Sequence, residues 1–403
     1  MKTQKLRFGI AGAGSRGTHA FGRMIGARDD AEVVALCDTN AIRREKAAEI
    51  LKIQPRFFAT VPEMVRDAGL DAIVITTPDF FHEQHAVEAL EGGVPVLIDK
   101  PLATTVKGCR RIMALAEKTA LPVMIGFNLR HNAVLKKLKQ IISRGDLGRV
   151  FLIENREFYD GGRTYMARWN RDYAFCGGLW IHKGSHDFDI FQWLLDFPKP
   201  VKVSAFADIS VLNMDNLPFQ PDPGTPVGPT CHACDYQAKC PDFNDLGSEL
   251  DRWGDEAAKL DGYHKDLCIY ASDKSVHDNG IALVEYDNGA RASHLECFVT
   301  PMTDRLYTVV GTGGQAEASL HTGVITVRPR WSKDTVTYTI APETGGHGGA
   351  DPHVLDTFIQ VIRGEQPNAS TTEHGMLSTA VGQAAELARR ENRVVMIDEL
   401  FRD

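Results

Sequence analysis

The sequence has no run approaching the roughly 18 apolar residues that cross a bilayer. It has no excess of positive charge, since 45 Lys and Arg stand against 53 Asp and Glu and give a formal charge of −8. It has no low-complexity tract, and its first residues pass into a strand-like run without an apolar export segment. These absences argue against a membrane protein, a nucleic-acid-binding protein and a disordered chain, and we expect a cytoplasmic protein.

The composition is that of an ordinary globular protein, with 43% hydrophobic and 24% charged residues. A chain of 403 residues is too long for one compact core and predicts two domains, or three. Short Val- and Ile-rich runs recur in the first 126 residues and are typical of strands buried on both faces of a parallel sheet. These runs are Leu6–Ala11, Val33–Cys37, Ala72–Ile75, Val94–Ile98 and Val123–Ile125.

Segments with helical spacing, such as Ala41–Leu51 and Glu83–Gly92, lie between these runs. Strand–helix alternation of this kind predicts a doubly wound α/β domain over residues 1–126. After Gly126, segments that alternate apolar and polar residues predict a second α/β domain with an open, mostly antiparallel sheet over residues 127–403. Helices are expected around Leu179–Leu195.

A glycine-rich turn follows the first predicted strand. The segment Gly12–Gly17 reads G-A-G-S-R-G and precedes a helix-compatible stretch, so its backbone can approach a pyrophosphate at a helix N-terminus. Asp38 follows the second strand at a spacing suited to binding ribose hydroxyls. Its charge favours NAD, although Arg43 and Arg44 keep NADP open. The candidate cofactor residues of this region are Gly12, Gly14, Ser15, Arg16, Gly17 and Asp38.

Three further motifs resemble the glucose–fructose oxidoreductase, inositol dehydrogenase and MocA (Gfo/Idh/MocA) family of oxidoreductases. Thr77–His82 is similar to its Thr-Pro-x-x-x-His segment, and Asp99–Ala103 to its Glu-Lys-Pro signature with aspartate in place of glutamate. Cys176–Asp189 resembles its glycine-rich catalytic helix. The resemblance implies a Rossmann domain followed by a substrate-binding α/β domain, and an open sheet that pairs with a partner chain in a homodimer or homotetramer.

The resemblance also implies roles for particular residues. Thr77, Pro78, His82 and Lys100 would lie at the cofactor. Lys100 would bind a substrate hydroxyl, and His186 would be the general base. A histidine suits proton transfer near neutrality and a lysine can stabilise a developing alkoxide.

One position departs from the family pattern. Four residues before His186 the family has an aspartate, whereas this chain has His182 followed by Lys183. If the stretch is one helix, the two histidines share a face. Lys100, His182, Lys183 and His186 would then make a basic pocket with an altered proton relay, suited to an anionic substrate or to a different reaction. We expect His182 to be a catalytic residue that assists Lys100 and His186. The alternatives are that His182 packs against or supports the site, or that it belongs to a His-x-x-x-His metal site.

The segment 156–171 interleaves arginines with aromatic residues. Aromatic faces stack on sugar rings and polar donors bind hydroxyls, so this pattern favours carbohydrate binding, although an ordinary surface loop would read the same way. The candidate substrate residues are Lys100, Arg156, Arg168, Trp169, His182, Lys183 and His186.

The eight cysteines are too few for a disulfide scaffold, but four of them lie close together in sequence. These four are Cys231, Cys234, Cys240 and Cys268. Thiolates at such spacing select zinc or an iron–sulfur cluster, and independent free thiols are the remaining reading. We expect a structural zinc that pins a Cys-rich insertion at about residues 213–268.

Taken together, the sequence predicts an NAD-dependent oxidoreductase that removes hydride from a ring carbinol of a sugar, sugar acid or cyclitol. An NAD-dependent glycosidase is the main alternative, acting by transient oxidation, elimination, hydration and re-reduction. A non-catalytic protein that keeps the dinucleotide site is a third hypothesis, which the presence of Lys100 and His186 disfavours.

Overall fold

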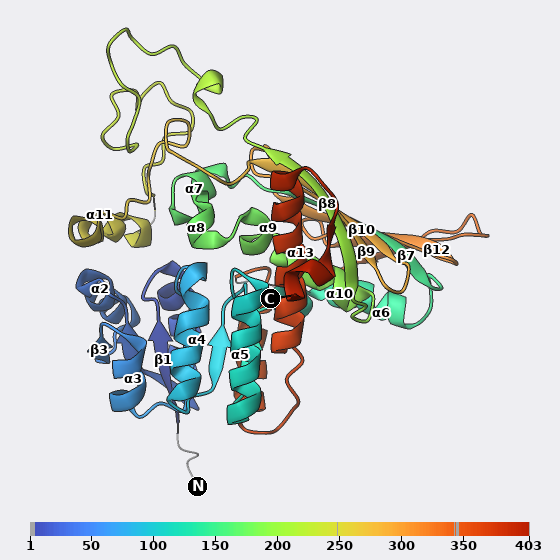
Figure 1. Cartoon of the computed structure of the whole chain (residues 1–403), viewed down its shortest axis with the longest axis horizontal. Helices are drawn as coiled ribbons and strands as arrows, with labels where there is room; N and C mark the ends of the chain where they lie inside the picture. Colours follow the sequence, from blue (N-terminus) through green and yellow to red (C-terminus); the bar gives the residue numbers. More distant parts are fainter. Residues whose placement is uncertain (1–4, 248, 342, 344–345, 403) are drawn as a thin grey trace.

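The computed structural model describes residues 5–402 except 248, 342, 344 and 345. It has two β-sheets, each with its own helices, and an extended insertion above the first sheet (Figure 1). Within these residues, no helix is both long and apolar enough to cross a membrane.

The first sheet has six parallel strands in the order β3-β2-β1-β4-β5-β6. All five predicted strands are present, and one strand was missed. The missed strand β3 is three residues long and exposes Arg56 and Phe57, so it carries no buried apolar run. The strands are β1 Leu6–Ala11, β2 Ala31–Cys37, β3 Arg56–Phe58, β4 Ala72–Ile75, β5 Val96–Ile98 and β6 Val123–Ile125.

Helices flank both faces of this sheet, and together they confirm the predicted doubly wound fold. The short helix η1 follows the glycine-rich turn. Helix α2 is preceded by its N-cap Asn40, whose side-chain oxygen accepts backbone N–H bonds from the first turn. The helices are η1 Arg16–Gly22, α1 Arg23–Gly26, α2 Ala41–Leu51, α3 Val61–Ala68, η2 Asp79–Phe81, α4 His82–Glu91 and α5 Val106–Thr119.

The second sheet has nine strands in the order β14-β13-β12-β11-β7-β10-β9-β8-β15. The predicted, mostly antiparallel sheet is confirmed, with β7 and β10 as a parallel pair. The strands are β7 Val150–Phe158, β8 Pro200–Asp208, β9 Asn279–Tyr286, β10 Arg291–Cys297, β11 Asp304–Gly311, β12 Gly314–Ser319, β13 Val324–Pro329, β14 Val336–Thr339 and β15 Val395–Met396.

The remaining helices cover one face of this sheet or join the two halves. Phe358 of α12 packs edge-on against Phe8 of β1, so a helix from the end of the chain completes the core of the first sheet. Helix α13 packs on both β8 and α5. These helices are η3 Asn128–His131, α6 Ala133–Ser143, α7 Gly162–Met166, η4 Trp169–Arg171, α8 Tyr173–Cys176, α9 Leu179–His182, α10 Ser185–Leu194, η5 Met214–Asn216, α11 Glu249–Asp261, α12 Ala350–Ile362, α13 Thr372–Glu391 and η6 Ile397–Phe401.

The segment Leu179–Leu195 is helical as expected, but it is not one helix. Helix α9 ends at His182 and α10 begins at Ser185. The condition under which His182 and His186 would share one helix face, a single continuous helix, is therefore not met. Gly184 lies at the interruption, where a Cβ atom would stand 2.8 Å from the carbonyl oxygen of Trp180.

Gly178, which precedes α9, has a backbone conformation that only glycine adopts easily. Its φ is +101°, and a Cβ there would lie 2.0 Å from the buried carboxylate of Glu386. We predict that Gly178→Ala lowers the free energy of unfolding by about 2 kcal/mol or more, through backbone strain and a steric clash.

Urea unfolding would measure this loss. The matched control is Gly26→Ala, where the added methyl meets nothing within 4 Å and φ is not positive. Equal stability of the two variants would contradict the prediction.

Candidate functional site

The glycine-rich turn closes tightly at two of its glycines and is open at the third. A Cβ at Gly17 would lie 2.1 Å from the Gly12 carbonyl oxygen, and one at Gly12 would lie 2.8 Å from the backbone of Thr76. At Gly14, by contrast, a Cβ would meet no described atom within 4 Å. The turn is packed against the protein on one side and leaves backbone exposed on the other, as a pyrophosphate requires.

Asp38 lies beside this turn at the end of β2. Its carboxylate accepts N–H bonds from Ala13, at 3.1 Å, and Asn40, at 2.9 Å. Burial raises the pKa of Asp38, against the opposing effect of those bonds and of Arg43. The structure thus brings together the phosphate turn and the acid predicted to bind ribose.

His82 holds two cofactor loops together from inside the protein. It is 1% exposed, with Nδ1 2.6 Å from the carbonyl oxygen of Pro101 and Nε2 3.0 Å from that of Thr77. Both nitrogens are therefore engaged with the loops that carry Thr77, Pro78 and Lys100. His82 positions these loops instead of presenting a free nitrogen to a ligand.

Lys100 follows β5 and reaches across to the second domain. Its ammonium donates to the backbone carbonyl oxygen of His182 at 2.5 Å. Burial lowers the pKa of Lys100, while nearby Asp79 and Asp99 oppose that effect. Two of its donor hydrogens remain for a substrate at the carboxyl edge of the first sheet.

Both ring nitrogens of His182 are used by the protein. Nδ1 lies 2.7 Å from Oδ2 of Asp79, and Nε2 accepts from the side-chain amide of Asn170 at 2.9 Å. The rings of Tyr165 and Trp169 pack edge-on against the imidazole at 5.7 and 5.2 Å between centroids. Among the roles that the sequence allows for His182, this geometry favours one in which His182 positions its neighbours.

His186 has an unused nitrogen. The residue is 3% exposed, and Nδ1 has no hydrogen-bond partner among the described residues. Burial lowers the pKa of His186 well below its ordinary value, and the positive charges of Lys100 and Arg305 add to that effect. A neutral, buried imidazole beside Lys100 can accept a proton from a substrate hydroxyl.

A second set of charges ties the phosphate turn to the end of the chain. Arg16 pairs with Asp99 at 2.8 Å and with Asp351 at 2.6 Å. His347 lies 3.1 Å from Asp351, and its ring centroid is 5.9 Å from that of His186. Asp351 and His347 were not predicted from the sequence, because no motif joins residues so distant in the chain to the cofactor turn.

The cationic residues near His186 are paired with carboxylates. Lys183 lies 3.0 Å from Glu157 and stands over the ring of Tyr159, and Arg305 pairs with Glu157 and with Asp187. The expectation of a basic pocket is therefore wrong in its charge balance, since these carboxylates offset the lysines. Alternation along β7 could have pointed to Glu157, but nothing in the sequence pointed to Arg305.

The predicted substrate arginines lie in different places. Arg156 is on the outer face of β7, where its neighbour is Glu154 at 3.3 Å, whereas Glu157 is on the face toward Lys183. Arg168 precedes η4, next to Trp169. The structure therefore brings Trp169 to the site but leaves Arg156 on the opposite face of the sheet.

The four clustered cysteines line one small apolar cavity in the insertion. The backbone N–H of Cys231 donates a hydrogen bond to the carbonyl oxygen of Asp266 at 2.7 Å, and that of Cys268 donates to Pro229 at 2.8 Å. These hydrogen bonds bring Cys268 beside the other three cysteines. None of the four forms a disulfide bond within the described residues. Among the described side chains, the group with ligand atoms already within 4.8 Å of one another is Asp255, His264 and Asp266.

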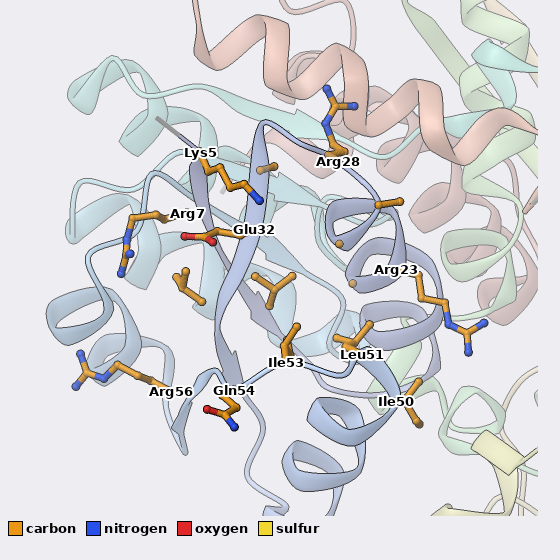
Figure 2. Close-up of a pocket in the computed structure, with 16 residues that line it drawn as sticks. Lys5, Arg7, Arg23, Arg28, Glu32, Ile50, Leu51, Ile53, Gln54 and Arg56 are labelled. Atoms are coloured by element: carbon orange, nitrogen blue, oxygen red, sulfur yellow. The ribbon is translucent and has the colours of Figure 1, made fainter. Parts of the chain in front are cut away.

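A separate cavity of about 750 Å³ opens at the amino ends of β1 and β2, opposite the phosphate turn. Figure 2 shows its labelled side chains, including Arg7, Arg28 and Arg56. Arg7 donates to the Gly69 carbonyl and Arg28 pairs with Asp30, so these charges serve the protein itself. The cavity is not part of the candidate active site.

The phosphate turn, Asp38 and the Lys100 loop define a dinucleotide-binding α/β protein with a second domain over the cofactor edge. Residues 6–127 match the model for the oxidoreductase family's NAD-binding Rossmann fold, and residues 139–397 match that family's C-terminal alpha/beta domain. The chain belongs to the Gfo/Idh/MocA oxidoreductase family, and is an NAD-binding oxidoreductase.

Individual relatives are similar over different shares of the chain. YteT of Bacillus subtilis (strain 168) is 27% identical over 400 residues, which is 92% of each chain. An inositol 2-dehydrogenase of Klebsiella pneumoniae is 29% identical over 192 residues, covering 47% of this chain and 55% of that enzyme.

Solved structures share the fold. The WlbA dehydrogenase from Bordetella pertussis, in complex with NADH and UDP-GlcNAcA, has a TM-score of 0.70 at 20% identity, covering 98% of this chain and 99% of that one. An oxidoreductase from Agrobacterium radiobacter, in complex with NAD+, L-tartaric acid and magnesium, has a TM-score of 0.72 at 15% identity, covering 98% and 100%.

The lowered pKa of His186 makes stability depend on pH. The unfolded chain takes up a proton on this histidine near pH 6.5, whereas the folded protein takes it up only at lower pH, so acidification favours unfolding. We predict that, below pH 6.5, protonation of His186 lowers the free energy of unfolding by about 1.4 kcal/mol for each pH unit.

Urea unfolding of the wild type and His186→Gln at pH 8 and pH 5.5 would measure it, with exposed His321→Gln as control. The wild type should lose more stability on acidification than His186→Gln. An equal loss in both would show that His186 does not titrate as described.

Proposed function

We propose that the protein transfers hydride between NAD and a ring carbinol of a sugar, sugar acid or cyclitol. The observation that carries this proposal is the buried, unpartnered Nδ1 of His186 near Lys100, at the carboxyl edge of the NAD-binding sheet. Alcohol oxidation needs a proton acceptor for the hydroxyl and a cation to stabilise the developing alkoxide, both close to the nicotinamide. The name of the Klebsiella relative, inositol 2-dehydrogenase, supports a polyol substrate.

Each residue has a chemical task in this reaction. NAD, when bound, would accept the hydride, and the open backbone at Gly14 would face its pyrophosphate. The ammonium of Lys100 donates to the reacting hydroxyl and stabilises its developing negative charge, while Nδ1 of His186 accepts the proton. His182, held by Asp79 and Asn170, fixes Lys100 through its carbonyl oxygen.

We predict that Lys100→Met abolishes turnover and leaves NADH binding largely intact, because the side chain acts on the substrate hydroxyl. His186→Ala should lower kcat by about 10²- to 10⁴-fold, the usual contribution of a general base. The readouts are NADH formation with a panel of neutral and acidic sugars and cyclitols, and NADH binding by fluorescence.

The control is Lys107→Met, which removes the same charge at an exposed position of α5. Wild-type turnover in Lys100→Met would refute the assignment.

A redox-neutral glycosidase is the second candidate. The partly exposed ring of Trp169 next to His182 favours it, since an aromatic ring there suits the stacking of a second sugar ring. The same assay separates the two activities: a dehydrogenase accumulates NADH with free sugar, whereas the glycosidase releases an aglycone without net NADH.

The open sheet offers a surface for a second copy of the chain. Leu152, Phe206, Ile281 and Leu283 are exposed apolar side chains on its strands, from 41% to 65% accessible. Phe206 and Ile281 are paired neighbours on β8 and β9, and exposed apolar side chains of this kind favour association. We accordingly propose a homodimer or homotetramer formed through this sheet.

The cysteine cluster is proposed to hold a structural zinc. Zinc takes four thiolates, and the cavity that Cys231, Cys234, Cys240 and Cys268 share supplies that donor set. Backbone N–H groups of Gly228 and Asn244 lie 3.5 Å from the sulfurs of Cys234 and Cys231. The insertion has little regular structure, and such a site would hold its two ends together.

We predict about one zinc per chain in the purified protein, because a four-thiolate site binds one ion. Cys234→Ser should lose it, while Cys297→Ser, on β10 and outside the cluster, should retain it. Elemental analysis is the measurement. Iron in place of zinc would indicate an iron–sulfur cluster, and neither metal would show that the cysteines are free thiols.

A further inference from the structure

The insertion reaches back to the NAD-binding domain. Helix α11, within the insertion, lies against α2 of the first sheet (Figure 1). Asn40, at the start of α2, donates from its side-chain amide to the carbonyl oxygen of Ala257 at 2.9 Å and to Oδ2 of Asp261 at 2.8 Å. Both Asn40 and Ala257 are buried, so α11 forms a packed contact beside the loop that begins at Asp38.

Arg43 connects this contact to the ribose-binding acid. Its guanidinium lies 2.7 Å from Asp261 and 3.7 Å from Asp38, and it stands over the ring of Tyr263 at 5.5 Å. Burial opposes ionisation of Asp261, but bonds from Asn40, the Tyr263 backbone and Arg43 outweigh it and keep the pKa of Asp261 below its usual range. Arg43 is therefore held between two carboxylates.

The neighbouring arginine, Arg44, also forms hydrogen bonds within the protein. Arg44 donates to the carbonyl oxygens of Asp38 and Phe58, and so holds the ends of β2 and β3 together. In related folds, an arginine at this edge accommodates the 2′-phosphate of NADP, whereas an acid binds the 2′-hydroxyl of NAD. In this chain Asp261 pairs with Arg43, which could otherwise turn to a 2′-phosphate, and adds a second negative charge to that side of the pocket.

We propose that Asp261 of the insertion determines the preference for NAD over NADP, by neutralising Arg43 at the adenosine ribose. This inference rests on NAD binding by the first domain and is independent of the substrate. Removing the Asp261 charge releases Arg43 and relieves repulsion of a 2′-phosphate. The insertion is then part of the cofactor site as well as an addition to the second domain.

The test is the ratio of NADPH to NADH affinity, measured by calorimetry in the absence of any sugar. Asp261→Asn should shift this ratio toward NADPH by about threefold or more, the scale of a partly exposed ion pair. The matched control is Glu256→Gln, which removes the same charge at an exposed position of α11. A third protein, Asp261→Asn with Arg43→Ala, should lose the gain in NADPH affinity.

A ratio in Asp261→Asn within threefold of the wild type, or an equal shift in Glu256→Gln, would overturn the proposal. Retention of the gain without Arg43 would overturn it too. The thermal unfolding temperature of each variant is compared with that of the wild type, to check that the contact between α11 and α2 is retained. Because no turnover is measured, failure of the proposed sugar chemistry would leave this result unaffected.

Discussion

The hydrogen bond from Lys100 to the carbonyl oxygen of His182 is the contact on which the site depends. It joins the loop after β5 to helix α9 and so fixes the second domain over the carboxyl edge of the first sheet. A buried ammonium is costly without partners, and the adjacent carboxylates of Asp79 and Asp99 reduce that cost. The fold therefore holds a cation where a substrate oxygen can use its remaining hydrogens.

This bond exists because the helical segment is interrupted. In a continuous helix the carbonyl of His182 would accept the N–H of residue 186. Here the N–H of His186 points to Lys183 O instead, and the carbonyl of His182 is left for Lys100. The interruption also separates the roles of the two histidines: His182 is engaged at both nitrogens, whereas His186 keeps Nδ1 open.

Local sequence patterns predicted most of the strands and helices. Motifs predicted the glycine-rich cofactor turn and the candidate catalytic residues Lys100 and His186. Helix α2 was predicted at its observed bounds, since Ala41–Leu51 carries helical spacing, whereas β3 is too short and exposed to leave a pattern. The roles of Lys100 and His186 were predicted from the resemblance, whereas their burial was not. The charge balance could not be predicted, because Glu157 and Arg305 come together only when β7 pairs with β11.

The same limit explains why the insertion was read only as a cysteine-bearing segment. Its prolines and cysteines indicate an irregular region, but the sequence carries no sign that Asp261 meets Arg43 across more than two hundred residues. The cysteine cavity and the α11 contact are close in sequence, since Cys268 follows Asp261 by a few residues. Residues 262–267 therefore join the cysteine cavity directly to the carboxylate that pairs with Arg43. One insertion thus carries two features that lie far apart in kind, a cavity lined by cysteines and an acid that pairs with Arg43 beside Asp38.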